Sequence, residues 1–315
     1  MQAILLLLTF CIMVTVAEAR QKRIVIEEFG FSSQPDLAAL YDVQDIHAFN
    51  RTTFGASGWT DTDELPESST WYDTAAAGVL ANGWCDGSLT YFDHEVWRVE
   101  AADAQSVRLA TAHKWAVMGN ELKARLPNCT LSFYGYLGSN GVKSDYTRAT
   151  SSNPVTYADW VRMNTDLAEI YSSSWDFLMP TFYISSTRDA DGYAAMQDFH
   201  TYFHNTILEY RRMLSTYGHG QWLMPFIWHR KRDDSAYLDM DVWKDMICTA
   251  YLEGDGVSWF TISGTAWSDT AEYWIHMKNV LEDPNPCGNF ESTRSAATTR
   301  SPATPRSLAI TRTNR

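Results

Sequence analysis

The sequence predicts an α/β fold, a (β/α) TIM-type barrel with seven or eight parallel strands. Short runs rich in Val, Ile, Phe, Tyr and Trp recur along the chain, and helical stretches separate them. This alternation is typical of repeated βα units in a parallel sheet. The body of about 270 residues suits one large α/β domain or two small ones, and no linker divides it. Seven strand-like runs place the chain close to the usual eight-stranded barrel.

The predicted strands are apolar runs bounded by residues that favour turns. In chain order they cover residues 23–29, 46–54, 88–95, 130–136, 177–184, 221–229 and 257–262. The run at 46–54 is the weakest of them.

Three helices are predicted from apolar residues that repeat at helical spacing. They cover residues 104–126, 157–171 and 199–217. In the first, the apolar positions are Val107, Leu109, Ala110, Trp115, Met118 and Leu122.

The two ends of the chain differ from the body. Residues 1–19 carry an apolar segment followed by Ala17-Glu18-Ala19, a pattern typical of a secretory signal peptide. Residues 291–315 are mainly Ser, Thr, Pro and Arg, so they bury too little to offset the entropy of ordering and we expect a disordered tail. The barrel is therefore expected over 20–290. We expect a secreted, extracellular protein, with a lysosomal location as the alternative.

Four cysteines follow the predicted signal peptide, and three pairings could satisfy them. We favour Cys85 with Cys129, because each lies just before a predicted strand and neighbouring parallel strands bring such positions together. The pair Cys248–Cys287 would then attach the last helix to the body. Two sequons, at Asn50 and Asn128, predict N-glycosylation in the same secreted context.

The charge balance limits the classes of partner. The chain has 25 Lys and Arg against 38 Asp and Glu; without the predicted signal and tail, 20 basic and 36 acidic residues remain, a net charge of −16. A body of this charge repels nucleic acid and anionic membranes. We expect no nucleic-acid partner, no membrane span, no cofactor and a monomer. The 13 Trp and 16 Tyr supply rings on which sugars stack, although many of these rings fill the core.

Two carboxylates at the end of one predicted strand are the strongest functional signal. Because side chains alternate along a strand, Asp93 and Glu95 point to one face while His94 points to the other. Burying two like charges side by side is costly, so chemistry explains them better than packing. Glycoside hydrolysis is the reaction that most often uses paired carboxylates. The alternative is an acidic strand end that caps a loop or pairs with Arg98.

Catalytic groups of such barrels lie at the C-terminal ends of the strands, and these ends are rich in rings. The candidates there are Glu27, Glu28, Tyr134, Tyr136, Tyr183, Trp228, His229 and Trp259. Glu27 and Glu28 alternate faces, so at most one of them looks inward. A core tyrosine or a core histidine remains the alternative role for Tyr183 and His229.

The segment Asp93-His94-Glu95-Val96-Trp97-Arg98 resembles the Asp-x-Glu-x-Trp-Arg motif of the hyaluronidase family of glycoside hydrolases. Pro180-Thr181-Phe182-Tyr183 is similar to that family's Pro-Ser-Ile-Tyr, and residues 225–229 are similar to its Pro-Val-Phe-Ala-Tyr segment. Residues 254–259 resemble its glycine-rich strand before an active-site Trp. His229 stands where the family has Tyr, and the active-site Trp register is open between Trp259 and Phe260.

This resemblance implies a secreted endo-acting hydrolase that cleaves an N-acetylhexosamine-containing polysaccharide, of hyaluronan or chondroitin type, with retention and by substrate assistance. Glu95 is then the acid that protonates the glycosidic oxygen, and Asp93 orients the acetamido group. The remaining strand-end residues, with Tyr183 and Trp97 among them, become substrate contacts.

Two other functions remain open from the residues alone. A retaining hydrolase of another polysaccharide, for example a sulfated one, could use Glu95 with Glu27 or Glu28 as the second carboxylate. A barrel without catalysis could simply bind glycans. We expect no metal site, because His200 and His204 share a helix face without the Glu that a metal motif of that spacing carries.

Overall fold

The computed structural model describes residues 23–27, 31–32, 35–41, 43–94, 96–97, 99, 103–134, 157–171, 174–184, 199–231, 235–260, 265–282 and 287. The strands are β1 (Arg23–Glu27), β2 (Phe31–Ser32), β3 (Gln44–Asn50), β4 (Leu89–Asp93), β5 (Thr130–Phe133), β6 (Phe177–Leu178), β7 (Thr181–Ile184), β8 (Trp222–Leu223), β9 (Phe226–Lys231), β10 (Gly256–Phe260) and β11 (Thr265–Ala266). The helices are α2 (Leu37–Leu40), α3 (Ser69–Ala81), α4 (Gln105–Arg125), α6 (Tyr157–Tyr171), α7 (Phe199–Tyr217), α8 (Met240–Glu253) and α9 (Glu272–Glu282).

Seven strands form one parallel sheet in the order β5-β4-β3-β1-β10-β9-β7. The predicted number of strands and their parallel direction are confirmed. The predicted closed barrel is not formed by this hydrogen-bond ladder, because β5 and β7 are its two edges among the described residues. The short β6 pairs with β8 in a separate two-stranded sheet. A backbone bond from Asp176 N to Leu131 O (2.9 Å) links the start of β6 to β5.

Proline divides two of the predicted strands into shorter pieces. The run at 177–184 becomes β6 and β7, with Pro180 between them, and the run at 221–229 becomes β8 and β9, with Pro225 between them. Proline has no N–H to give to a ladder. Its carbonyl still accepts: Phe226 N donates to Pro180 O (2.8 Å) and Ser258 N donates to Pro225 O (2.8 Å). Pairing therefore continues past each break.

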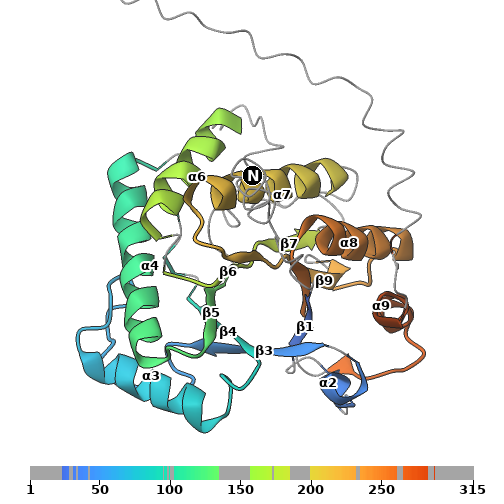
Figure 1. Cartoon of the computed structure of the whole chain (residues 1–315), viewed down its shortest axis with the longest axis horizontal. Helices are drawn as coiled ribbons and strands as arrows, with labels where there is room; N and C mark the ends of the chain where they lie inside the picture. Colours follow the sequence, from blue (N-terminus) through green and yellow to red (C-terminus); the bar gives the residue numbers. More distant parts are fainter. Residues whose placement is uncertain are drawn as a thin grey trace, which may run out of the picture.

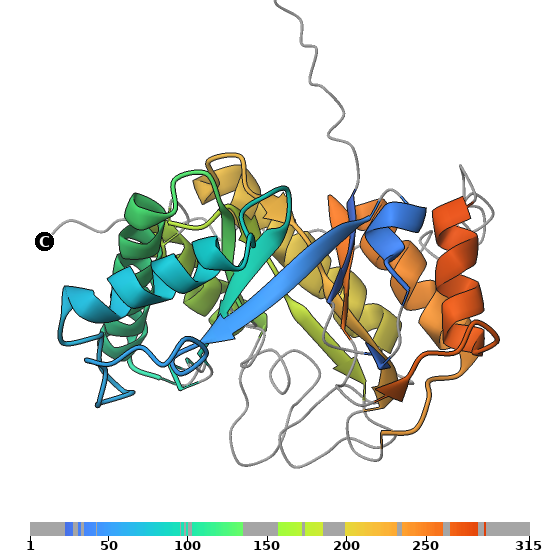
Figure 2. The ribbon, with the colours of Figure 1, turned by 90° about the horizontal axis from the view of Figure 1, so that it is seen from below.

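The helices form an outer ring around the strands (Figure 1). Figure 2 shows β3 running obliquely across the molecule, between α3 on one side and α2 on the other. The three predicted helices are confirmed as α4, α6 and α7. A ring of this kind gives the sheet an outer face packed on helices and an inner face that looks across the molecule.

Two groups of buried apolar side chains lie on the two faces of the sheet. The larger lies between strands and helices and includes Phe92, Trp115, Trp243 and Trp259. The smaller fills the inner face and consists of Ile46, Leu89, Tyr91, Phe177, Met179, Met224 and Phe226. Because both faces are buried, the strands read as nearly continuous apolar runs, as is usual for parallel sheets.

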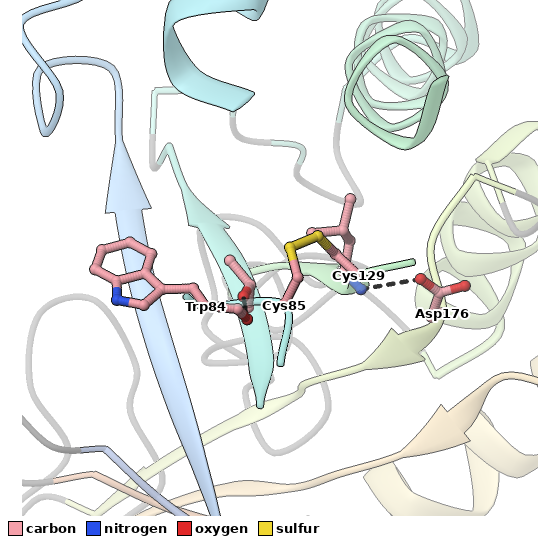
Figure 3. Close-up of a disulfide and its surroundings, with 6 residues drawn as sticks. Trp84, Cys85, Cys129 and Asp176 are labelled. Carbon is pink, nitrogen blue, oxygen red and sulfur yellow. Dashed lines mark hydrogen bonds between the residues drawn. A yellow bond between two sulfur atoms is a disulfide. The ribbon is translucent and has the colours of Figure 1, made fainter. Parts of the chain in front are cut away.

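Both predicted disulfides are present. Cys85 and Cys129 join the segments that lead into β4 and β5, and their Cα atoms are 4.5 Å apart (Figure 3). Beside this bridge the carboxylate of Asp176 accepts from Leu131 N (2.9 Å). Cys248 of α8 pairs with Cys287, which follows α9. The predicted signal peptide (1–19) and tail (291–315) lie outside the described residues. In the part of the chain that is described, no helix has the length and apolar character to cross a bilayer.

Candidate functional site

Asp93 is the last residue of β4 and lies on the inner face of the sheet. The alternation along β4 sets this orientation, because Leu89 and Tyr91 belong to the inner cluster. The Asp93 side chain is partly buried, and its register partner on β3 is Asn50. Glu95, the proposed acid, lies outside the described residues.

Three aromatic side chains stand on the same inner face as Asp93. Tyr134 follows β5, Tyr183 belongs to β7 and Trp228 belongs to β9. The hydroxyls of Tyr134 and Tyr183 hydrogen-bond to each other, and this bond spans the seam between the two edge strands. The ring of Trp228 meets that of Tyr183 edge-on at 5.7 Å. A carboxylate, two hydroxyls and an indole thus line one wall.

His94 points to the opposite face, as the alternation predicts. Its ring packs on Trp59 (4.7 Å) and Trp97 (4.7 Å) in the outer core. Both His94 Nε2 and Trp97 Nε1 donate to one carbonyl, Thr62 O, at 3.0 and 2.9 Å. Burial lowers the pKa of His94, so its ring is uncharged at pH 7. Residues 94 and 97, on either side of Glu95, are thereby held to the loop between β3 and α3.

This arrangement corrects the expected place of Trp97. The sequence motif assigned it to substrate binding, whereas the structure buries its ring (5% exposed) in the outer core. Its indole stacks at 6.4 Å on Phe133, which lies on the outer face of β5. The structure therefore does not bring Trp97 to the wall formed by Asp93 and the tyrosines. Its hydrogen bond to Thr62 gives it a structural role beside that wall.

His229 and Trp259 also lie on the outer face. Trp259 Nε1 donates to His229 Nδ1 at 3.2 Å, and His229 stacks on Tyr273 of α9 at 4.5 Å. The register pairs Trp259 with Ile227, and Phe260 with Trp228. The inner position on β9 is thus Trp228, one residue before the one that the motif indicated. On β10 the active-site position was open between Trp259 and Phe260. Trp259 belongs to the outer core, so the structure does not support Trp259 at the inner face.

Three further candidates receive no placement. Tyr136 and Glu28 lie outside the described residues. For Glu27 the structure gives only the backbone, in register with Ile46 of β3.

The two sequons differ in their surroundings. Asn128 is exposed in the turn before β5. Asn50 is exposed at the end of β3, where its Oδ1 accepts from Thr52 N (2.9 Å) and Thr52 Oγ1 (3.0 Å). Asn50 therefore sits at the rim beside Asp93, whereas Asn128 lies at the opposite end of the strands.

Among the described residues, no group of three His, Cys, Asp or Glu side chains is placed to hold a metal ion. His204, one of the pair considered for metal binding, faces Glu253 of α8 at 3.2 Å.

No protein-family model matches the chain, and no curated protein matches it in sequence. Among solved structures, a monoclinic crystal form of bee venom hyaluronidase is similar, with a TM-score of 0.53 and 11% sequence identity over 87% of this chain and 98% of that chain. The same enzyme in complex with a hyaluronic acid tetramer has a TM-score of 0.51 and 12% sequence identity over 87% of this chain and 96% of that chain. Active domain 2 of a thermostable chitinase from Pyrococcus furiosus has a TM-score of 0.44 and 11% sequence identity over 85% of this chain and 89% of that chain.

The likeness to bee venom hyaluronidase shows a shared fold. It confirms the distant resemblance that the sequence motifs indicated.

Proposed function

We propose that this chain is a secreted glycoside hydrolase that cuts inside an N-acetylhexosamine-containing polysaccharide of the hyaluronan or chondroitin type, with retention of configuration. One observation carries the proposal: Asp93 lies at the C-terminal end of β4, on the same inner face of the sheet as the hydrogen-bonded pair Tyr134 and Tyr183. Strand ends of this kind hold the catalytic groups of barrel enzymes. The shared fold with bee venom hyaluronidase supports the same reading.

In the proposed reaction the sugar's own acetamido group is the nucleophile. Glu95 donates a proton to the glycosidic oxygen while the acetamido carbonyl oxygen attacks the anomeric carbon and the glycosidic bond breaks. Asp93 accepts a hydrogen bond from the acetamido N–H and stabilises the positive charge that develops there. Glu95, now ionised, takes a proton from water, which opens the ring intermediate and restores the starting configuration.

The aromatic wall orients the sugar in this scheme. The hydroxyls of Tyr134 and Tyr183 hydrogen-bond to each other, and in the bound complex the hydroxyl of Tyr183 donates to the acetamido oxygen. Trp228 presents its indole beside Tyr183, and an aromatic ring of this kind packs against the apolar face of a sugar. Tyr136 and the inward member of the pair Glu27 and Glu28 complete the proposed contacts.

The two alternative functions make different demands on these groups. A two-carboxylate hydrolase cleaves sugars that lack an N-acetyl group, with Glu27 or Glu28 as its second acid. A glycan-binding barrel binds the same polymers and releases no product. The hydroxyls of Tyr134 and Tyr183 on the face of Asp93 support the substrate-assisted reaction, because such groups bind an acetamido oxygen.

The test is a digestion panel of hyaluronan, chondroitin, chitin-type oligomers and sulfated fucans, read by product mass. We expect hydrolysis products from the first two. Glu95→Gln and Asp93→Asn should each lower kcat by about 10²–10⁴-fold, the usual contribution of a positioned acid or base. The matched control is Asp86→Asn, an exposed carboxylate in the turn before the same strand.

Each outcome separates the candidates. Turnover of polymers without N-acetyl groups supports the two-carboxylate hydrolase instead. Binding without product supports the glycan-binding barrel. Products two hydrogens lighter for each bond cut identify a lyase and contradict hydrolysis.

The disulfides and the sequons support secretion, with a lysosomal location as the alternative. We also propose that the protein acts as a monomer. Fractionation of the expressing cells and light scattering of the purified protein test these two points.

A further inference from the structure

A second cavity lies on the outer face of β9, away from the wall that contains Asp93. Its volume is about 180 Å³, and it opens between the end of β9 and the first turns of α8 and α9. Four aromatic side chains line it, namely His229, Tyr237, Trp243 and Tyr273. Pockets for drug-sized ligands are usually about 300–1,000 Å³, so this cavity suits a single small ring.

Three of the rings form a nearly parallel set. His229 and Tyr273 stack at 4.5 Å with an angle of 25°, and Tyr237 and Tyr273 stack at 5.4 Å with 18°. Trp243 meets His229 edge-on at 6.1 Å. His229, Trp243 and Tyr273 are each less than 5% exposed, whereas Tyr237 is 50% exposed at the mouth. Buried neighbours therefore fix the walls, and the outermost ring meets solvent.

The polar groups of the cavity supply both donors and acceptors. His229 Nδ1 accepts from Trp259 Nε1 and its Nε2 is buried, so His229 contributes ring surface to the wall of the cavity. Burial raises the pKa of Tyr273 to about 12, and its hydroxyl stays protonated at physiological pH. Glu272, exposed in the first turn of α9, supplies an acceptor at the mouth.

The charges at the mouth favour an uncharged ligand. The guanidinium of Arg230 lies 4.5 Å from the centre of the Tyr237 ring and disfavours a cation there. The carboxylate of Glu272 disfavours an anion. An uncharged ring with an apolar face and several hydroxyls matches both the aromatic walls and the mixed polar groups.

We infer that this cavity is a second saccharide site, which holds one neutral sugar unit of a long glycan outside the catalytic wall. The two sites lie on opposite faces of β9, because Trp228 and His229 are consecutive residues of that strand. The inference rests on the proposed action on a polysaccharide and adds a separate binding site to it.

The test compares Tyr237→Ala with the control Tyr217→Ala, a partly exposed tyrosine at the end of α7. Retention of each protein in gels that contain hyaluronan or soluble chitin polymer measures binding, and kcat and KM are measured on polymer and on tetrasaccharide. We expect Tyr237→Ala to weaken retention and raise KM for polymer about 3–10-fold, the loss of about one ring contact. Its kcat on the tetrasaccharide should equal that of wild type. Glu272→Gln, an exposed change outside the core, replaces a charged acceptor with a weaker neutral one. On the neutral chitin polymer it should therefore weaken retention and raise KM in the same direction, which keeps the test valid even if Tyr237→Ala does not fold.

The outcomes distinguish this inference from the proposed reaction. Equal retention and equal polymer KM in wild type, Tyr237→Ala and Glu272→Gln overturn the second site and leave the reaction standing. Weakened retention in these variants, with no turnover by wild type, supports the site and contradicts the reaction. Retention of no glycan by wild type contradicts both.

Discussion

Two consecutive residues at the end of β4 face opposite sides of the sheet. Asp93 faces the inner wall, while its neighbour His94 is 6% exposed and packs among the rings of the outer core. The bond from His94 to Thr62 O then fixes the end of β4 to the preceding loop. A buried residue thus limits where its neighbours, the proposed catalytic carboxylates, can lie.

The first prediction concerns the pH dependence of stability at His94. Burial lowers the pKa of His94 from its ordinary value of 6.5. The unfolded chain therefore binds more protons below pH 6.5, and stability is lost as the pH falls through this range. We expect the free energy of unfolding to decrease between pH 7 and pH 5, and to decrease less in His94→Gln. Urea denaturation followed by tryptophan fluorescence measures both.

His47 acts in the same direction, because burial also lowers its pKa. The double variant with His47→Gln should therefore show the smallest pH dependence. Val107→Gln, a change at an exposed and uncharged position, is the control and should follow wild type. An identical decrease in wild type and in the double variant would contradict the prediction.

The sequence predicted which face of the sheet a strand residue occupies more reliably than it predicted which single residues contact the substrate. Asp93 could be placed because it is the last residue of β4, where the alternation that starts at Leu89 still holds. His229 and Trp259 were assigned to the substrate from motifs, and a shift of one residue in such a match exchanges the faces of a strand. Trp97 follows β4 beyond its last strand residue, where the alternation no longer applies.

Among the elements, the seven strands of the main sheet could be predicted, whereas the short β2 and β11 and several helices could not. The strands are buried on both faces, so their composition alone identifies them. In α3, aromatic and β-branched residues such as Trp71 and Val79, together with Gly78, lower helix propensity. This helix is selected by packing: Trp71, Ala75 and Val79 are all at most 1% exposed. The breaks at Pro180 and Pro225 follow from a missing N–H, which the apolar pattern does not reveal.

The second prediction concerns the contact between α4 and α6. Arg108 and Asp166 form an ion pair at 2.6 Å with side chains 4% and 11% exposed, and Gln105 Nε2 donates to the same carboxylate at 2.9 Å. Asp166→Ala leaves a buried guanidinium without this partner, and we expect a loss of about 3–5 kcal/mol in the free energy of unfolding.

The matched control is Asp159→Ala on the same helix. Asp159 pairs with Arg162 at the surface, where the side chains are 30% and 60% exposed, and such pairs contribute up to about 1 kcal/mol. Urea denaturation of both variants measures the difference. Equal losses in the two variants would show that burial of the Arg108 pair has no special effect.

The third prediction concerns the bridge between Cys85 and Cys129, which are 44 residues apart. In the chain-entropy model, closing a loop of this length stabilises the fold by about 4 kcal/mol. The double change Cys85→Ser with Cys129→Ser should therefore lower the free energy of unfolding by up to that amount. Serine at 129 keeps the sequon at Asn128 intact, so glycosylation is unchanged between the samples compared. A loss well below 1 kcal/mol would refute the expected contribution.

At the scale of the whole molecule, charge and fold act separately. The full chain carries a net charge of −13, which has no bearing on which strands pair. Arg230 does not extend freely from the end of β9, since it donates to Ser235 O (3.1 Å) and lies on Tyr237. The acidic body therefore dominates the long-range field that a charged polymer meets.

The fourth prediction follows from this field. Hyaluronan and chondroitin are polyanions, so the protein repels them at low salt. Screening shortens the Debye length from about 30 Å at 0.01 M to about 8 Å at 0.15 M, and we expect the rate at low hyaluronan concentration to rise severalfold over this range. Chitin-type oligomers, which are neutral, are the control and should show little change. A rate on hyaluronan that falls steadily with salt would contradict the prediction.

The alternation of side chains along β9 limits which mutations this protein can accept in evolution. Trp228 and His229 open onto two different compartments, so a single inserted or deleted codon between Gln221 and Phe226 would send each ring into the other's compartment. A point substitution leaves Trp228 and His229 on their own faces of β9, whereas an insertion or deletion of one residue displaces both side chains together. The segment should therefore drift in composition while keeping a constant length.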